Sequence, residues 1–141
     1  MNRFVVDASI VAKLFFDEEH SDTAAAMVRN AVEALAPDFV YLETTNVILT
    51  RMKRDKLNPD ATRLTLRALF ALRIAPHPTP ALISPAFDIA VETGRTVYDC
   101  TYLALAIREK CQLVTADGRF FHALKNSRFS KHVHLVGAAT N

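Results

Sequence analysis

The sequence has few of the features that mark secreted and membrane proteins. Cys100 and Cys111 are its two cysteines, too few for a disulfide framework, and we expect both to be reduced thiols. The longest uncharged stretches fall well short of the ~20 residues that a membrane-spanning helix needs. Asp7 and Lys13 interrupt the apolar N-terminal stretch, which argues against a signal peptide. The sequence therefore predicts a cytoplasmic protein with no membrane segment.

The sequence also lacks an excess of either charge. Its 17 Lys and Arg residues and 15 Asp and Glu residues leave a formal net charge of +2. Overall charge therefore does not indicate a nucleic-acid binder, and such a function would need local patches. Internal repeats, low-complexity tracts and Gly/Ser linkers are absent as well. With 50% hydrophobic and 23% charged residues over 141 positions, we expect one globular domain, residues 1–141.

What the sequence does contain is an alternation of strand-like and helix-like segments. Short apolar runs predict strands at residues 4–6, 112–117 and 132–137. The proline-rich segment 73–80 is predicted to be extended but not a central strand. Helical spacing or capping predicts helices over residues 8–16, 23–35, 38–55, 57–72, 81–94, 98–110 and 118–126. This alternation favours an α/β fold with a mainly parallel sheet covered on both faces.

Acidic residues recur where these segments begin or end. Asp7 and Asp117 each follow a predicted strand, and Asp99 opens a helix. In a parallel α/β sheet such positions share one edge, where ligands bind. Each Asp alone equally suits a helix N-cap. Glu43 lies within a nearly uncharged helical stretch, and alone it suits a solvated helix position. The joint pattern is what favours a functional site.

Convergence of these four acids would have a chemical consequence. At ~5 Å and an effective dielectric constant of ~20, each pair of ionised carboxylates costs about 3 kcal/mol. A cluster of four would need a bound cation or would take up protons. Oxygen ligands alone suit Mg²⁺ or Mn²⁺ rather than zinc. Such cations activate water and stabilise phosphoryl charge, so the pattern indicates a nuclease.

Four segments of the sequence, "FVVDAS", "APDFVYLETTNVI", "TVYDCTYLALA" and "LVTADGRF", resemble the ordered motifs of PIN-domain ribonucleases. Their order and spacing are similar to those of the VapC-type toxins of toxin–antitoxin pairs, over essentially the whole chain. The resemblance implies a three-layer α/β/α sandwich with a mainly parallel sheet of about five strands, including Ile74–His77. It also implies a Mg²⁺- or Mn²⁺-dependent endoribonuclease that is usually a homodimer and is held in check by a cognate antitoxin. Its substrate would be tRNA or another structured RNA.

The resemblance also assigns roles to individual residues. Matched position by position, the catalytic and metal-binding acids of the family are Asp7, Glu43, Asp99 and Asp117. Glu43 would serve as a ligand or as the base for the attacking water. The family's polar supporting positions match three further residues: Asn46, Thr115 and Ser9.

Several basic and aromatic residues allow two interpretations. Basic residues that follow Asp117 are candidate RNA contacts, because contacts of Lys and Arg with phosphate dominate nucleic-acid affinity, and they equally suit a solvated surface. They are Arg119, Lys125, Arg128 and Lys131. Tyr98 and Tyr102 lie four positions apart near Asp99, where they would line the site or pack in the core.

Two rival functions are weighed against the nuclease. One is a PIN-fold module that binds RNA or protein without cleaving, which a replaced metal-binding acid would favour, and none is replaced. The other is an aspartyl-phosphate enzyme or receiver domain that uses Asp7 or Asp99. Phosphatases of that type usually carry a D-x-D pair after the first strand, and here the third residue is Ser9.

Overall fold

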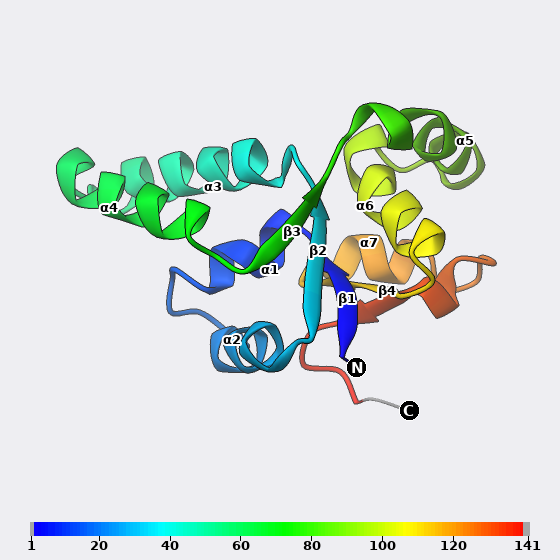
Figure 1. Cartoon of the computed structure of the whole chain (residues 1–141), viewed down its shortest axis with the longest axis horizontal. Helices are drawn as coiled ribbons and strands as arrows, with labels where there is room; N and C mark the ends of the chain where they lie inside the picture. The colour runs from blue at the N-terminus through cyan, green and yellow to red at the C-terminus, as the bar shows by residue number, and fades with distance from the viewer. Residues whose placement is uncertain (1, 140–141) are drawn as a thin grey trace.

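A computed structural model describes residues 2–139, in which five strands form one parallel sheet (Figure 1). The strand order is β3-β2-β1-β4-β5, and every neighbouring pair is parallel. The strands are β1 (Arg3–Val6), β2 (Glu33–Pro37), β3 (Ile74–His77), β4 (Gln112–Thr115) and β5 (Val133–Leu135). β3 lies at the edge of the sheet, which suits its one proline, Pro76, because proline has no N–H to donate to a second neighbouring strand. The predicted sheet of about five strands is confirmed.

Helices cover both faces of the sheet, as predicted for a three-layer α/β/α sandwich. In Figure 1, α1 to α4 lie on one side of the strands and α5 to α7 on the other. The helices are α1 (Ala8–Lys13), α2 (Ser21–Asn30), α3 (Val40–Arg54), α4 (Pro59–Phe70), α5 (Ile83–Thr93), α6 (Val97–Arg108) and α7 (Gly118–Ala123). Two short 3₁₀ turns, Pro80–Leu82 and Ser130–His132, precede α5 and β5.

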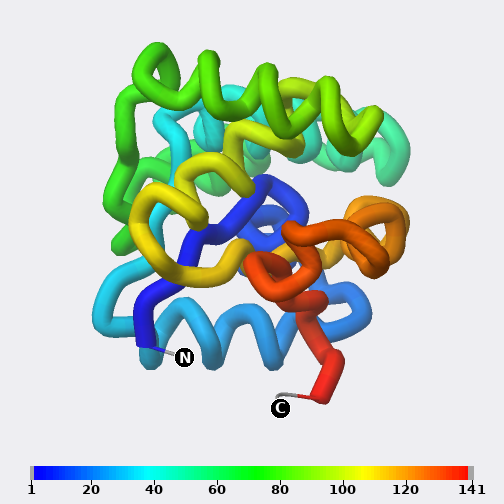
Figure 2. The backbone as a smooth tube through the Cα atoms, turned by 90° about the vertical axis from the view of Figure 1, so that its right-hand side faces the viewer, coloured from blue at the N-terminus to red at the C-terminus, as the bar shows by residue number. Residues whose placement is uncertain are grey.

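α6 is the central helix of its layer. Every residue from Cys100 to Ala106 is buried, because the sheet lies on one side of the helix and α5 covers the other. Figure 2 shows α5 as an outer rod in green with α6 in yellow inside it. A helix that is apolar on all sides is stable only in such a buried position. This packing fixes where the first turn of α6, with Asp99, can lie.

The strands share one direction, which defines the two ends of the molecule. β1 begins at the same end where the last described residues lie (Figure 2). The carboxyl ends of the strands point to the opposite end, where α3 and α6 begin (Figure 1). Open parallel sheets bind ligands at that edge.

One predicted helix is wrong in its second half. The sequence predicts a helix over residues 23–35, but α2 ends at Asn30 and Glu33–Pro37 is strand β2. Ala34, Leu35 and Ala36 are fully or almost fully buried between β1 and β3. Alanine favours helices intrinsically, yet pairing on both sides outweighs that preference. The following helix was predicted from residue 38 and begins at Val40.

Other predicted ends are confirmed by their capping. Asn58 Oδ1 accepts hydrogen bonds from the backbone N–H groups of Asp60 and Ala61, with Pro59 as the first helical residue of α4. Gly94 ends α5 in the left-handed conformation, with φ of 72°, which glycine adopts without steric cost. Within residues 2–139, no helix combines the length and apolarity that a membrane span requires. The single domain over residues 1–141 stays a prediction.

Candidate active site at the carboxyl ends of the strands

Asp7 stands at the carboxyl end of β1, beside β4. Its Oδ1 accepts hydrogen bonds from Ser9 Oγ (2.5 Å) and from the backbone N–H of Ile10 (3.2 Å). Its Oδ2 accepts a hydrogen bond from Thr115 Oγ1 (2.5 Å). Asp7 is therefore the N-cap of α1, as its position allowed, and its carboxylate is also held in one orientation from both sides.

The two hydroxyls on Asp7 also fix the turn that leads to Asp117. Ser9 Oγ accepts a hydrogen bond from the backbone N–H of Ala116 (2.9 Å), and Thr115 Oγ1 accepts one from that of Asp117 (3.1 Å). Asp117 in turn caps α7, because its Oδ1 accepts from the backbone N–H of Phe120 (3.1 Å). Ser9 and Thr115, two of the three predicted supporting residues, thus link Asp7 to the backbone at Ala116 and Asp117.

The third predicted supporting residue lies apart from this network. Asn46 is exposed on α3, one turn beyond Glu43. Its carbonyl oxygen accepts a hydrogen bond from Thr50 Oγ1 (3.0 Å). A supporting role for Asn46 stays a prediction.

Asp99 lies in the first turn of α6 but does not cap it. Thr96 is the N-cap, and its Oγ1 accepts a hydrogen bond from the backbone N–H of Asp99 (3.1 Å). The N-cap interpretation of Asp99 is therefore wrong, and its carboxylate does not cap the N-terminus of α6. Arg95 Nη2 lies 3.8 Å from Asp99 Oδ2. We did not predict Arg95 as a site residue, and helical i,i+4 spacing could not have indicated it, because Arg95 precedes the N-cap of α6.

Glu43 reaches the same edge from α3, on the other face of the sheet. Its Oε1 accepts a hydrogen bond of 2.8 Å from the phenol of Tyr102 on α6. Tyr102 is 1% exposed, and its ring lies 5.0 Å from that of Phe39. Both interpretations of Tyr102 are therefore right, because its ring packs in the core and its hydroxyl faces the site. Tyr98 is 66% exposed. Glu43 is half-buried, so the solvated interpretation of this residue is wrong.

The pKa values of three of these acids reflect their neighbours. Burial raises the pKa of Asp7 to about 6, and the charge of Glu43 raises it further. The hydrogen bonds from Ser9 and Thr115 act in the opposite direction and lower this pKa. Burial and the charge of Asp99 raise the pKa of Glu43, against the hydrogen bond from Tyr102. Clustered acids are typical of catalytic sites and of cation sites.

The same kind of coupling continues from Asp99 to Asp117. Burial and the charge of Asp117 raise the pKa of Asp99, against the nearby charge of Arg95. The four predicted acids therefore form one continuous electrostatic group, Asp7–Glu43–Asp99–Asp117. Burial and the Glu43 carboxylate raise the pKa of Tyr102, which keeps its phenol protonated as a donor.

The donor chemistry of this group fits a hard cation, since carboxylate oxygens are the ligands that Mg²⁺ and Mn²⁺ prefer. Among residues 2–139, no group of three or more His, Cys, Asp or Glu side chains is arranged to hold a metal ion. Metal binding by these acids stays a prediction.

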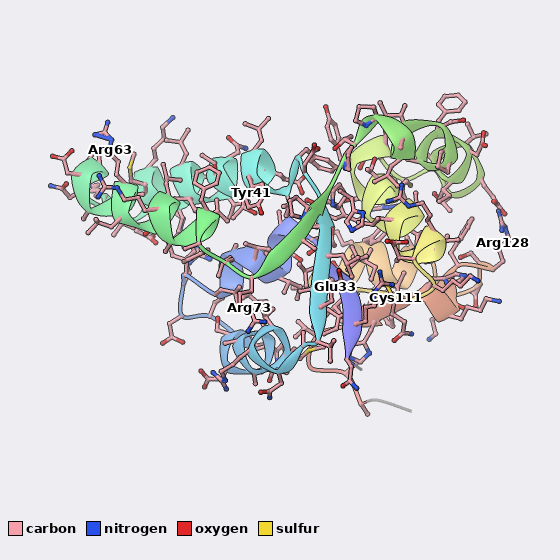
Figure 3. The ribbon with its side chains drawn as sticks, in the orientation of Figure 1. Glu33, Tyr41, Arg63, Arg73, Cys111 and Arg128 are labelled. Carbon is pink, nitrogen blue, oxygen red and sulfur yellow. The ribbon has the colours of Figure 1, made fainter. Side chains whose placement is uncertain are left out.

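All four predicted RNA contacts, Arg119, Lys125, Arg128 and Lys131, are exposed, and Arg128 is also paired with an acid. Arg119 and Lys125 lie exposed on and just after α7. Arg128 forms two-pronged hydrogen bonds with Glu92 of α5, the shortest 2.9 Å, and its guanidinium carbon lies 4.2 Å from the Phe129 ring centroid. Figure 3 places Arg128 at the outer edge of the molecule, beside α5. Contacts of these four residues with RNA stay predictions.

An apolar groove lies elsewhere on the surface. It has a volume of about 650 Å³ and is lined by residues such as Val28 of α2, Val32 and Ile74 of β3. None of the four acids contributes to its lining. The charged residues of the groove are Arg29, Glu33 and Arg73, so it holds a single carboxylate and no cluster of acids like that at the strand ends. The four acids therefore define the candidate active site.

Comparison with known proteins decides the family. A family model described as PIN domain matches residues 4–125. The chain belongs to the PIN-domain family. The predicted resemblance is confirmed by a PIN-domain relative, Ribonuclease VapC3 of Pyrobaculum aerophilum. That relative is 34% identical over 119 residues, which are 82% of this chain and 89% of the relative.

Solved structures show the same PIN fold at lower sequence identity. A toxin–antitoxin complex from Klebsiella pneumoniae matches with a TM-score of 0.61 and 15% identity, covering 93% of this chain and 95% of that one. VapC20 of Mycobacterium tuberculosis, described as a sarcin–ricin loop cleaving toxin, matches with a TM-score of 0.63 and 20% identity. The match covers 85% of this chain and 94% of VapC20. These two likenesses bear on the fold.

Proposed function

We propose that this chain is a metal-dependent endoribonuclease, the toxin component of a toxin–antitoxin pair. One observation carries the proposal. In a chain 34% identical to Ribonuclease VapC3, Asp7, Glu43, Asp99 and Asp117 form one electrostatic group at the edge where parallel sheets bind ligands.

Asp7, Asp99 and Asp117 would hold Mg²⁺ or Mn²⁺, with Glu43 as a further ligand or as the base. Such a cation, when bound, lowers the pKa of water and stabilises charge on a phosphoryl group. The chain's own contribution is orientation. Ser9 and Thr115 fix Asp7 through both carboxylate oxygens, and Thr115 also fixes the backbone of Asp117.

Glu43 is suited to accept a proton from the attacking water. Tyr102 occupies Oε1 of Glu43 with its hydrogen bond, which leaves Oε2 for the proton. Burial and Asp99 raise the pKa of Glu43, and a base is most effective when its pKa lies nearer the working pH. The Tyr102 phenol thereby fixes the direction of this carboxylate, and its hydrogen bond lowers the pKa of Glu43, against burial and the charge of Asp99.

The substrate class rests on the family rather than on this chemistry. Hydrolysis by activated water needs no ribose 2′-hydroxyl, so the acids alone do not select RNA over DNA. The relative named as a ribonuclease supports RNA. A structured RNA, tRNA or ribosomal RNA, is our proposal, and the likeness to VapC20 makes the sarcin–ricin loop one specific candidate.

An antitoxin protein in the cytoplasm is the proposed regulatory partner. It is supported by the fold shared with a protein from a toxin–antitoxin complex. Co-expression of the chain with the product of a short neighbouring gene, followed by purification through a tag on one of them, tests this partner. A true antitoxin would co-purify and would suppress RNA cleavage.

A homodimer is the proposed assembly. Ile83, Phe87 and Val91 follow one another at i, i+4 and i+8 along α5 and are 51%, 58% and 71% exposed. Residues at this spacing share one face of a helix. An exposed apolar stripe of this kind marks an interaction surface, and cyclic dimers are the commonest assembly that such a surface forms.

The second candidate is a PIN-fold module that binds RNA or protein without cleaving. Replacement of a metal-binding acid would favour it, and Asp7, Glu43, Asp99 and Asp117 are all present in this chain. The nuclease and an RNA-binding module both predict binding to RNA, a protein-binding module does not, and only the nuclease predicts new RNA ends.

Incubation of the antitoxin-free protein with total cellular RNA tests the proposal. Reactions with Mg²⁺, Mn²⁺ or EDTA are followed by sequencing of the new ends. The nuclease predicts cuts at discrete sites in either cation and none in EDTA, and the cut sites name the substrate. RNA that is bound but left intact in both cations would favour the binding module.

A further inference from the structure

Arg95 is a positively charged residue among the acids of the candidate site. It lies between Gly94, which ends α5, and Thr96, which caps α6. Its Nη2 atom is 3.8 Å from Asp99 Oδ2, which is longer than a hydrogen bond between such groups, about 2.7–2.9 Å. The two charges are therefore close, yet the guanidinium N–H groups are not used by this carboxylate.

The donors of Arg95 are poorly satisfied. Its Nε atom is buried and has no hydrogen-bond partner within residues 2–139. A guanidinium carries five N–H donors and no acceptor, and a buried donor without a partner is costly. The side chain as a whole is 29% exposed, so an incoming anion can reach it. Arg128 differs, because its donors already engage Glu92.

Packing holds Arg95 between two of the acids. Its guanidinium carbon lies 5.7 Å from the ring centroid of Phe120, and the backbone N–H of Phe120 donates to Asp117. The side chain therefore extends from the start of α6, beside Asp99, toward the start of α7. A planar cation on an aromatic face is limited in the directions it can point.

We propose that Arg95 contacts a phosphate of the bound nucleic acid, with its N–H groups donating to non-bridging oxygens. This inference rests on the proposed function, in which RNA is the substrate. A group of four acids repels a polyanion, and a guanidinium with free donors offsets this at the point where the phosphate enters. The fork of N–H groups matches phosphate oxygens in geometry as well as in charge.

Equilibrium binding in EDTA tests the inference without metal and without turnover. The probe is a fluorescein-labelled, mixed-sequence, single-stranded RNA oligonucleotide, titrated at several KCl concentrations. The variants are Arg95→Gln, Arg95→Lys and, as a matched control, Arg63→Gln. Arg63 lies at the far end of α4 (Figure 3), where it pairs with Asp60.

Arg95→Gln should weaken binding about tenfold, the scale of one lost charged hydrogen bond. It should also lower the slope of log affinity against log salt by about 0.7, the value for one phosphate contact on a single strand. Arg95→Lys should keep the slope, because the charge stays, and should lose part of the affinity. Arg63→Gln should match the wild type in both respects.

Two results would count against the account in different ways. If wild type binds RNA and Arg95→Gln binds equally with the same slope, Arg95 only balances Asp99, and the inference is wrong while the proposed function stands. If wild type binds no RNA in EDTA and also leaves cellular RNA intact in Mg²⁺ and Mn²⁺, RNA is not a ligand and the proposed function falls as well. If wild type cuts RNA with a cation but binds none in EDTA, the comparison is made through the KM for cleavage, and an unchanged KM in Arg95→Gln contradicts the inference. Circular dichroism and thermal unfolding check that Arg95→Gln is folded. If it is not, Arg95→Lys decides, because unchanged affinity in that variant contradicts the proposed contact through the forked N–H groups of the guanidinium.

Discussion

The phenol of Tyr102 donates a hydrogen bond of 2.8 Å to Oε1 of Glu43, across 59 positions of sequence. The two residues lie on α6 and α3, which cover opposite faces of the sheet (Figure 1). They meet only at the edge where the strands end. The orientation of Glu43 is therefore set by the packing of a helix from the other layer.

Replacing Tyr102 by Phe should separate the role of the hydroxyl from that of the ring. The hydrogen bond from Tyr102 lowers the pKa of Glu43, so its loss raises that pKa. Because a base must be deprotonated to act, the acidic limb of the pH–rate profile should move to higher pH. We also expect a loss of about 1–3 kcal/mol of stability, the cost of leaving a buried acceptor unpaired. An unmoved acidic limb in a folded variant would exclude Glu43 as the base.

Asp7→Asn should make the protein more stable near neutral pH. Burial raises the folded-state pKa of Asp7 from 3.8 to about 6, so the folded state binds the proton more tightly than the unfolded state. This carboxyl therefore contributes stability below about pH 4 that is lost as pH rises toward 6, by at most about 3 kcal/mol. Denaturant unfolding at pH 4 and pH 7.5 measures it. The free energy of unfolding of the variant should exceed that of wild type at pH 7.5 but not at pH 4. An equal difference in this free energy at both pH values would contradict a raised pKa of Asp7.

Thr115→Val keeps the shape of the side chain and removes its hydroxyl. Asp7 Oδ2 then loses its donor and the backbone N–H of Asp117 loses its acceptor. We expect destabilisation by about 2 kcal/mol, the scale for buried groups left unpaired, and at least a tenfold loss of RNA cleavage. Thr65→Val on α4 is the control and should stay within about 0.5 kcal/mol of wild type. Wild-type cleavage by folded Thr115→Val would mean that Asp7 needs no support.

Phe87→Glu should disrupt the proposed homodimer. It places a charge in the middle of the apolar stripe on α5, where burial against a second copy would be costly. Light scattering coupled to size-exclusion chromatography should report a dimer for wild type and a monomer for the variant. Leu64→Glu, at a residue on α4 that is 62% exposed, is the control and should remain dimeric. A wild-type chain that is monomeric at all concentrations would contradict the assembly.

The parts of the fold that could be predicted are those with local signals. Asp7 directly follows a short buried strand, and Asp117 lies two residues after another. Asn58–Pro59 marks the start of α4 and Gly94 the end of α5 by residue type. β2 could not be predicted in this way. Its alanines belong to a helix-like stretch, and only pairing with β1 and β3 makes them a strand.

The features of the candidate site likewise differ in whether a local sequence signal predicts them. The four acids were predicted from position and from resemblance, and Ser9 and Thr115 from resemblance alone. The hydrogen bond between Tyr102 and Glu43 joins distant segments, so no local pattern determines it. The capping of α6 is different, because the spacing from Thr96 to Asp99 follows the S/T-x-x-E capping pattern with Asp in place of Glu. That pattern signals that the helix starts before Asp99. Within residues 2–139 the Asp99 carboxylate does not bond back to the Thr96 N–H as a full capping box would, so it remains available to the site.

The most direct test of the central claim compares Asp99→Asn with Asp60→Asn. Asp60 is an exposed acid on α4 that pairs with Arg63, so its variant controls for the loss of one negative charge. Cleavage of cellular RNA and binding of Mn²⁺ are measured for both variants and for wild type. The account predicts that Asp99→Asn loses both Mn²⁺ affinity and cleavage, the latter at least a hundredfold, a loss typical of removing a key electrostatic group. Asp60→Asn should keep both. Cleavage by wild type that persists in EDTA, or undiminished cleavage by Asp99→Asn, would contradict a cation-dependent centre built from these acids.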